Sequence, residues 1–204
     1  MRHLFFILAA VCAVTFWASL ASADPITFIH SGSGSGSLAG APFDVSAFTI
    51  TATGDTSSRT SGMLPGIFFI PHDTASIDID GVGMPIFTED TLTFVNNGNE
   101  VVGFSRPGSD LFNGPVDPAF AMWDMLSSIG PISGSGALMQ WAPGVQTDLG
   151  LLIFNDDGSM FDYSTWDIPT TFEAIVNPVP VPGAVVLGAL GLGVAGRLCR
   201  RRKA

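Results

Sequence analysis

The sequence predicts a mainly β domain, of the β-sandwich or jelly-roll type with one short helix, flanked by a signal peptide and a C-terminal hydrophobic helix. Three observations lead to this: short β-branched and aromatic runs recur between turn signals, a single segment has helical spacing, and an apolar stretch lies near each end. We expect a signal peptide at 1–23, an exported domain at 24–177 and a sorting and membrane segment at 178–204.

Residues 1–23 have the three parts of a secretory signal peptide. A short basic start precedes an apolar run from Leu4 to Leu20, and the small residues Ala21 and Ala23 form a site that signal peptidase accepts. Cleavage is expected after Ala23, which would also remove Cys12. An uncleaved N-terminal anchor is the alternative.

The predicted exported domain is strongly acidic. Residues 24–177 hold all 18 acidic side chains but only two basic ones, Arg59 and Arg106, so their formal charge is −16. A field of that sign repels nucleic acid and anionic lipid, and no nucleic-acid partner is expected. The same residues include no cysteine, so an apolar core rather than disulfides must hold the domain together.

The first strand is expected from Ile26 to Leu38, where small and polar residues alternate. Its serines would share one face and its glycines the other. Because apolar residues closely bracket SGSGSGS, a strand is favoured over a flexible linker, which remains the alternative.

The second strand is expected over residues 43–53, with Val45 on one face and Phe48 and Ile50 on the other. Residues 54–66 are polar and rich in breakers, which predicts a loop. Further strands are expected at Gly66–Ile70, Ala75–Ile79, Thr91–Val95, Glu100–Phe104, Gly134–Trp141, Leu149–Phe154 and Thr170–Val176.

The predicted helix follows Asp117. This residue would cap it, Pro118 would occupy the first turn, and Gly130 would close a helix of about ten residues. Phe120 and Trp123 would face the sheet. The tryptophans of the exported domain are expected in the core rather than on a sugar-binding surface.

Groups that could support catalysis are sparse. Ser105 lies in the sequence closest to a nucleophile elbow, but its glycine spacing is wrong by one residue. His30 and His72 lack the spacing of a zinc site, and His72 is expected in a loop. A carboxylate pair such as Asp156 with Glu173 is a third hypothesis for hydrolysis. No enzyme activity and no cofactor are expected.

Calcium binding is a weaker alternative carried by two acidic pairs. Asp78 and Asp80 precede a glycine, as in part of an EF-hand loop, but Phe87 stands where that loop needs its closing glutamate. Asp156 and Asp157 form a second pair in a turn. The preferred interpretation is that Asp78 and Asp80 occupy the outward side of a strand, so no metal site is expected.

The apolar run of residues 183–196 is followed by a basic cluster. As a helix it would be about 21 Å long, which is short for a bilayer core of about 30 Å. The cluster would remain cytoplasmic, placing the acidic domain outside. Its members are Arg197, Arg200, Arg201, Arg202 and Lys203.

This ending resembles the PEP-CTERM family of exosortase-sorted bacterial proteins. The residues that carry the resemblance are Pro180, Val181, Pro182 and Gly183, followed by the apolar run and the arginine cluster. Val181 stands where the family usually has glutamate. The domain also resembles an uncharacterised β-rich domain attached to such signals, notably in the stretches PITFIHSGSGSGSLAG, FTITATGDTSSRT and FNGPVDPAFAMWDMLSSIGPISGSG.

The pattern of residues 1–23 predicts signal peptidase as one partner. The resemblance implies processing by an exosortase-type protease after transient insertion in the inner membrane. It also implies association with extracellular polysaccharide and biofilm matrix. We therefore expect a non-enzymatic protein of the cell surface or matrix. A carbohydrate- or calcium-binding module at that location is the alternative function, and an ordinary single-pass anchor is the alternative for the tail.

Overall fold

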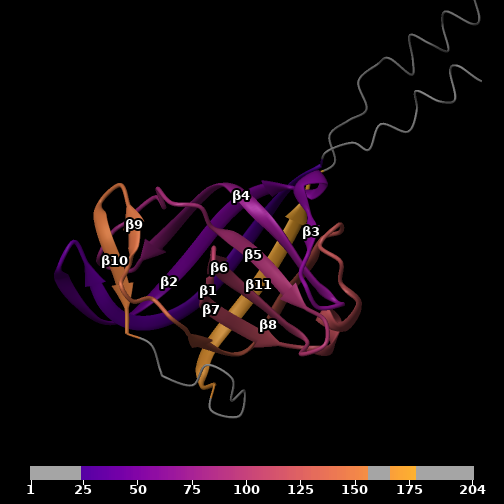
Figure 1. Ribbon diagram of the computed structural model, residues 1–204. Helices are drawn as coiled ribbons and strands as arrows, with labels where there is room; N and C mark the ends of the chain where they lie inside the picture. Colours follow the sequence, from indigo (N-terminus) through magenta and orange to yellow (C-terminus); the bar gives the residue numbers. More distant parts are fainter. Residues whose placement is uncertain (1–23, 156–165, 178–204) are drawn as a thin grey trace, which may run out of the picture. The chain divides into compact units, whose positions relative to one another are not determined.

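The computed structural model describes residues 24–155 and 166–177, which form eleven β-strands and two short 3₁₀ helices (Figure 1). The strands are β1 (Pro25–Leu38), β2 (Ala41–Asp55), β3 (Thr60–Ser61), β4 (Ile67–Ile79), β5 (Leu92–Asn96), β6 (Val101–Arg106), β7 (Ser109–Val116), β8 (Ile129–Leu138), β9 (Val145–Thr147), β10 (Gly150–Phe154) and β11 (Ile168–Val176). The 3₁₀ helices are η2 (Thr56–Ser58) and η3 (Pro118–Met122). The predicted signal peptide and terminal helix lie outside the described residues.

Eight antiparallel strands close into a barrel in the order β1, β2, β4, β5, β6, β7, β8 and β11. The barrel closes where β11 pairs with β1, from Ile26 with Val176 to Ser31 with Thr171. The mainly β prediction is confirmed, but a sandwich of two sheets is wrong. The reason is that β1 and β2 run for 14 and 15 residues, long enough to twist and bring the first strand beside the last.

The serine–glycine run is part of β1, so the strand prediction is confirmed over the linker. Its glycines face aromatic rings of the interior: Gly32 lies against Phe48 and Phe112, and Gly34 lies against Phe154. A Cβ on Gly34 would stand only 2.9 Å from a ring carbon of Phe154. The absent side chains therefore leave room for these rings.

The strand β4 replaces the two separate strands expected on either side of Pro71. It runs without a break, and the prediction that His72 lies in a loop is wrong. Pro71 is tolerated because the strand changes partner there: His72 pairs with Gly54 of β2, whereas Pro71 pairs with Leu92 of β5. Asp78 is exposed on β4 beside the buried Ile77 and Ile79, as expected. Asp80 is also exposed but lies in the turn that follows the strand.

The predicted helix after Asp117 is shorter than expected. Asp117 does cap it, because its Oδ1 accepts the backbone N–H of Ala119 at 2.8 Å, but η3 has five residues and ends at Met122, with Trp123 as its C-cap. The rings of Phe120 and Trp123 both pack on Phe172. Phe120 lies within η3 and Trp123 follows it directly, so this short element already brings both rings onto the barrel.

The core fills the inside of the barrel, as expected for eight strands. The largest fully buried side chains there are Trp141, Phe28, Phe48, Phe104, Phe112, Phe120, Phe154 and Phe172. A second, smaller buried cluster comprises Val101, Ala137, Met139 and Trp166. Trp123 and Trp166 are each 5% exposed and Trp141 is fully buried, which confirms the core prediction for these tryptophans.

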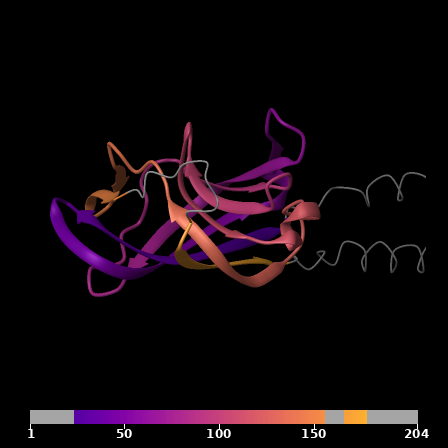
Figure 2. The same cartoon turned by 90° about the horizontal axis from the view of Figure 1, so that it is seen from below.

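The barrel has two distinct ends. At the first, which we name the joining end, the first and last described residues meet: Asn177 N donates to Pro25 O at 2.9 Å, and Thr56 N donates to Asp24 O at 3.1 Å. At the far end lie the β1–β2 turn and the β9–β10 hairpin (Figures 1 and 2). Both neighbouring segments of the chain therefore connect to the joining end.

Candidate functional site

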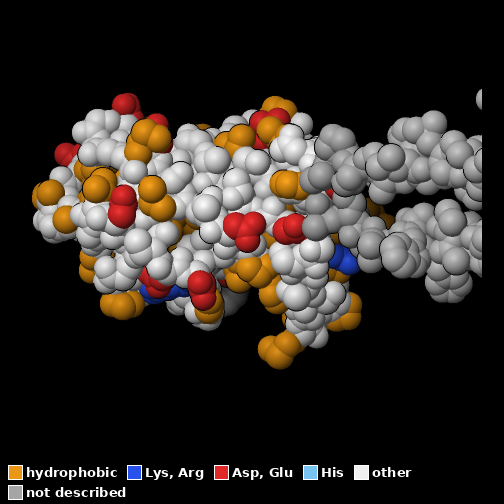
Figure 3. Space-filling model, turned by 90° about the horizontal axis from the view of Figure 1, so that it is seen from above, with side chains coloured by type: hydrophobic (Ala, Val, Ile, Leu, Met, Phe, Trp, Pro, Cys, Tyr) orange, Lys and Arg blue, Asp and Glu red, His pale blue; other side chains and the backbone are white. Residues whose placement is uncertain are grey.

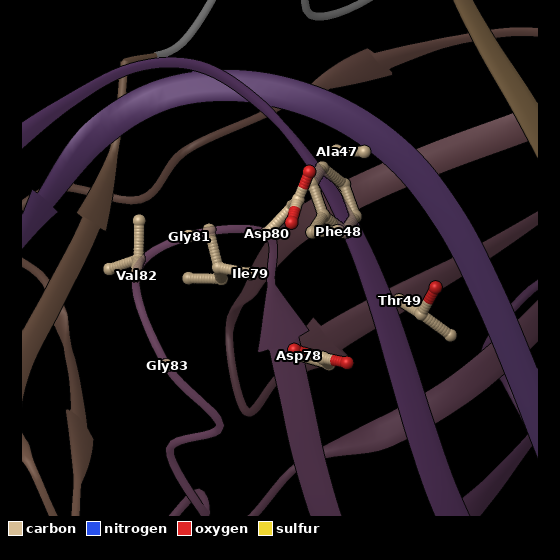
Figure 4. A pocket seen from close by; sticks show the side chains of 9 residues that line it. All are labelled: Ala47, Phe48, Thr49, Asp78, Ile79, Asp80, Gly81, Val82 and Gly83. Atoms are coloured by element: carbon tan, nitrogen blue, oxygen red, sulfur yellow. The ribbon is translucent and has the colours of Figure 1, made fainter.

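The predicted calcium candidates Asp78 and Asp80 line a shallow hollow of about 460 Å³ between β2 and the turn after β4 (Figure 4). Both carboxylates are exposed. In Figure 4 they lie apart, Asp80 beside Ala47 and Phe48 and Asp78 further along the strand. Backbone and apolar groups form most of the remaining lining.

A metal site at this hollow would need further ligands, since calcium takes six to eight oxygen atoms. Across residues 24–155 and 166–177, no three histidine, cysteine, aspartate or glutamate side chains gather as a metal-binding group. The other candidates, Asp156 and Asp157, lie outside the described residues. The structure brings Asp78 and Asp80 to one surface without a third acidic partner.

A polar chain of side chains crosses the apolar interior. Thr93 Oγ1 lies 3.1 Å from His30 Nε2 and 2.9 Å from His72 Nε2, and His72 Nδ1 lies 2.9 Å from Thr91 Oγ1. His30 is fully buried and His72 is partly exposed. Since both described histidines bond threonines rather than a carboxylate or serine, the arrangement does not form a nucleophilic triad.

Counting the available hydrogen atoms constrains which group donates and which accepts in these three hydrogen bonds. A threonine hydroxyl donates once and can accept twice, so at least one of the two histidine Nε2 atoms must donate to Thr93. His30 Nδ1 is buried without a hydrogen-bond partner, and an unpaired acceptor is less unfavourable there than an unpaired N–H. We therefore assign His30 Nε2–H as donor to Thr93. The single hydroxyl hydrogen of Thr93 can then be donated to His72 Nε2, with His72 Nδ1–H as donor to Thr91.

Both imidazoles are held neutral. Burial, followed by repulsion from His72, lowers the pKa of His30 from 6.5 to about 3. Burial likewise lowers the pKa of His72 to about 3. The ring of His72 stacks on Phe104 at 5.4 Å, and that of His30 contacts Phe172 at 4.8 Å. Both imidazoles thus lie against aromatic rings, where burial favours their neutral forms.

The outer wall of the barrel carries a second hollow, of about 460 Å³, across β4, β5 and β6; we name it the wall groove. Phe69 and Phe94 lie at its floor as direct cross-strand partners. Both rings are half-buried, and Phe94 also packs against the smaller core cluster. Flat apolar rings in a shallow groove are a surface on which sugar rings stack.

Polar groups border the two rings of the wall groove. The polar lining comprises Asn96, Ser105, Arg106, Ser109, Asp110 and Gln140. Arg106 is held in place by its Nη1 donating to Gly144 O at 2.7 Å and its Nη2 donating to Ala142 O at 3.0 Å. Ser105 Oγ donates to Asp110 Oδ1 at 2.7 Å. This combination of rings, cation and carboxylate suits a polyhydroxylated ligand.

The sequence had not identified this groove, because its residues come from the four strands β4 to β7 and from the β8–β9 region. Only Ser105 and Arg106 were singled out, for other reasons. The alternation of Leu92, Phe94 and Asn96 signals one outward face of a strand, but the partner Phe69 becomes visible only with the strand register.

The remaining predicted site residues fall into two groups. Glu173 lies half-buried on β11, opposite Ile29 of β1, and its suggested partner Asp156 is outside the described residues. The cleavage residues Ala21 and Ala23, the sorting motif and the basic tail also lie outside them. No helix in the described part of the chain is long and apolar enough to cross a membrane.

The position of the last described residue determines where the sorting segment is attached. Asn177 follows β11 directly and is hydrogen-bonded to Pro25 at the joining end. The segment that begins at residue 178 is therefore connected beside the first residues of the domain, with no further strand between them.

Comparison with known families identifies this segment. The family model of the PEP-CTERM protein-sorting motif matches residues 178–203, which include the proline pair, the apolar run and the arginine cluster. No curated protein and no solved structure matches the chain. The motif is that of exported proteins that are anchored by the C-terminus before processing. The chain therefore carries a PEP-CTERM protein-sorting motif at residues 178–203.

Proposed function

We propose that the chain is a non-enzymatic protein of the cell surface or extracellular matrix, delivered by C-terminal sorting and associated with biofilm polysaccharide. The PEP-CTERM motif at residues 178–203 is the observation that supports this most directly. The barrel agrees with it, because the described histidines are bonded to threonines and not to a carboxylate. The acidic wall would keep the exported domain hydrated and soluble.

The sorting part of the proposal is tested by the mass of the mature protein. Cells with and without the exosortase-type protease are compared by intact-mass spectrometry of the membrane and secreted fractions. The expected result is a form without the basic tail only when the protease is present. An identical C-terminus in both strains would overturn this part of the proposal.

Carbohydrate binding at the wall groove is the second candidate function. The paired rings of Phe69 and Phe94 and the hydrogen-bonded Arg106 favour it. Calcium binding is not proposed, since the described acidic residues do not assemble a ligand set.

The binding candidate is tested by calorimetry with oligosaccharides from matrix polysaccharides. Phe69→Ala is expected to abolish the heat of binding. Phe43→Ala is the matched control, because Phe43 is also a half-buried phenylalanine on a strand but lies outside the groove, against Phe154. Equal heats from both variants, or no heat from the unaltered protein, would rule out binding at this groove.

A further inference from the structure

Three loops at the joining end form one connected surface, which we name the joining-end surface. Residues 61–66, 96–100 and 117–128 make up its loops. Asn97 connects all three, because its N–H donates to Gly66 O at 2.8 Å and its Nδ2 donates to Trp123 O at 2.9 Å. Figure 2 shows η3 and the β3–β4 loop at this same end of the barrel.

Large apolar side chains project from this surface. Met63 is 104% exposed, Met122 is 90% exposed, Leu64 is 66% exposed and Leu126 is 44% exposed. In Figure 3 apolar side chains gather at both ends of the domain, with mixed polar groups between them. Large apolar groups this exposed at one end of a domain indicate contact with another apolar phase.

The acidic residues of this surface are partly withdrawn from solvent. Asp117 Oδ1 and Asp124 Oδ1 each accept a backbone N–H, at 2.8 Å and 3.1 Å, and both residues are half-buried, as is Glu100. The fully exposed acidic residues among those described lie on the barrel wall or towards the far end; they are Asp44, Asp73, Asp78, Asp80, Asp90, Asp110, Asp148 and Asp167. The joining-end surface therefore presents less exposed negative charge.

A cation also lies at this end. Arg59 is one of the two basic residues between positions 24 and 177. Its Nη1 donates to Asp124 O at 3.3 Å, and its guanidinium carbon lies 4.6 Å from the centre of the Phe68 ring. Arg59 therefore ties the β3–β4 region to the η3 loop and offsets part of the acidic charge.

The chain itself supplies the reason for a lipid partner. Only five residues separate Asn177 from Gly183, where the apolar run begins, and the six residue steps between the two span at most about 22 Å. While the C-terminal segment is in the bilayer, the joining end must therefore lie close to the lipid headgroups. This short tether gives a high effective concentration, so even weak apolar contacts would be occupied.

We propose that the joining-end surface contacts the membrane while the protein is still anchored, with Met63, Leu64, Met122 and Leu126 at the boundary between headgroups and acyl chains. The inference rests on the proposed C-terminal anchoring. It adds that the barrel docks on the lipid surface instead of moving freely on its tether. The residues act as a small interfacial anchor of the kind that apolar loops and helices provide.

The test uses the full chain with Cys12→Ser and Cys199→Ser, reconstituted in phosphatidylcholine vesicles. A fluorophore is attached through Met122→Cys, or through Met84→Cys as the matched control. Met84 is a methionine that is 65% exposed at the far end. Lipids brominated near the headgroup are expected to quench the probe at position 122 and to leave the probe at position 84 unchanged.

A second measurement separates direct contact from proximity. A probe at Leu64→Cys is expected to lose quenching when Met122→Gln is added, but to keep it when Met84→Gln is added. Chain that floats with the vesicles but shows equal quenching at positions 122 and 84 would overturn the docking and leave the anchoring intact. Chain that does not float with the vesicles would contradict the anchoring stage itself, and the docking with it.

Discussion

Thr93 Oγ1 lies 3.1 Å from Nε2 of His30 inside the barrel, and the same oxygen serves His72 at 2.9 Å. One hydroxyl thus satisfies a ring nitrogen from each of two strands, β1 and β4, that are not neighbours in the barrel. The bridge is compatible with two neutral rings, because a hydroxyl accepts from one and donates to the other. We therefore expect the free energy of unfolding of the barrel to depend on Thr93 and on the pH.

Thr93→Val is expected to destabilise the barrel by about 2–4 kcal/mol. The substitution keeps the shape of the side chain but leaves one nitrogen of His30 and one of His72 without a partner, and each such buried group costs about 1–3 kcal/mol. The free energy of urea unfolding measures the change. Thr49→Val on the exposed face of β2 is the control and should stay within about 0.5 kcal/mol of the unaltered protein. Equal effects would disprove the bridge.

Stability is expected to fall as the pH drops from 6.5 towards 3. The pKa of each buried histidine is lowered from 6.5 to about 3 in the folded state, so between these values the unfolded chain binds more protons. The contribution is fully present above the unfolded pKa and is lost as the pH falls. Two such groups give a slope of up to about 2.7 kcal/mol per pH unit.

The variant His30→Leu tests that assignment, since one of the two titrating groups is then absent. The slope of unfolding free energy against pH, measured between about pH 6 and 5, should fall to about half. Thr49→Val should retain the full slope. If His30→Leu left the slope unchanged, some other set of groups would be responsible for the acid sensitivity.

Gly34→Ala is expected to destabilise the protein by about 1–3 kcal/mol through overpacking. The added Cβ would lie 2.4 Å from Leu138 Cδ1 and 2.9 Å from the Phe154 ring, so both side chains would have to move. Gly98→Ala is the control, because its Cβ would approach nothing closer than 3.5 Å. Thermal unfolding measures both; a neutral Gly34→Ala would mean that the run is more loosely packed than the structure shows.

Replacing both motif prolines, Pro180→Ala with Pro182→Ala, is expected to block release of the tail. The motif matched at residues 178–203 contains both positions, and the domain fold should be unaffected because its last paired residue is Val176. Intact-mass spectrometry and blotting of the membrane fraction follow the tail. Pro42→Ala, at an exposed position in β2, serves as the control, and normal release from the double variant would show that recognition lies elsewhere.

The local pattern of the sequence was sufficient for most strands and for the inward and outward faces. Alternation placed Ile77 and Ile79 inside and Asp78 and Asp80 outside, as the structure shows. It failed at β7, since Gly114 and Pro115 there resemble a turn, and at β9, which has three residues. It also divided β4 at Pro71, because a change of pairing partner leaves no local signal.

The closure of the barrel and the residues of the candidate sites could not be predicted from the local sequence pattern. A sandwich and a barrel can share the same strands, and the difference is the β1–β11 pairing across more than a hundred residues. The Thr93 bridge and the Phe69–Phe94 pair likewise depend on register between distant strands. The sorting motif is different: its signal is a contiguous run of residue types, and it was recognised from the sequence alone.

The seam between β1 and β11 also sets an order of events during export. The N-terminal partner, Ile26, would cross the membrane early, but it cannot complete its pairing until Val176 has followed. The sorting segment starts at residue 178. The pairing of β1 with β11 that closes the barrel would therefore be completed only when that segment reaches the translocation site. Release from the membrane would thus come after folding is possible, and proteolysis upstream of residue 177 would leave an open, unsealed sheet instead of a mature product.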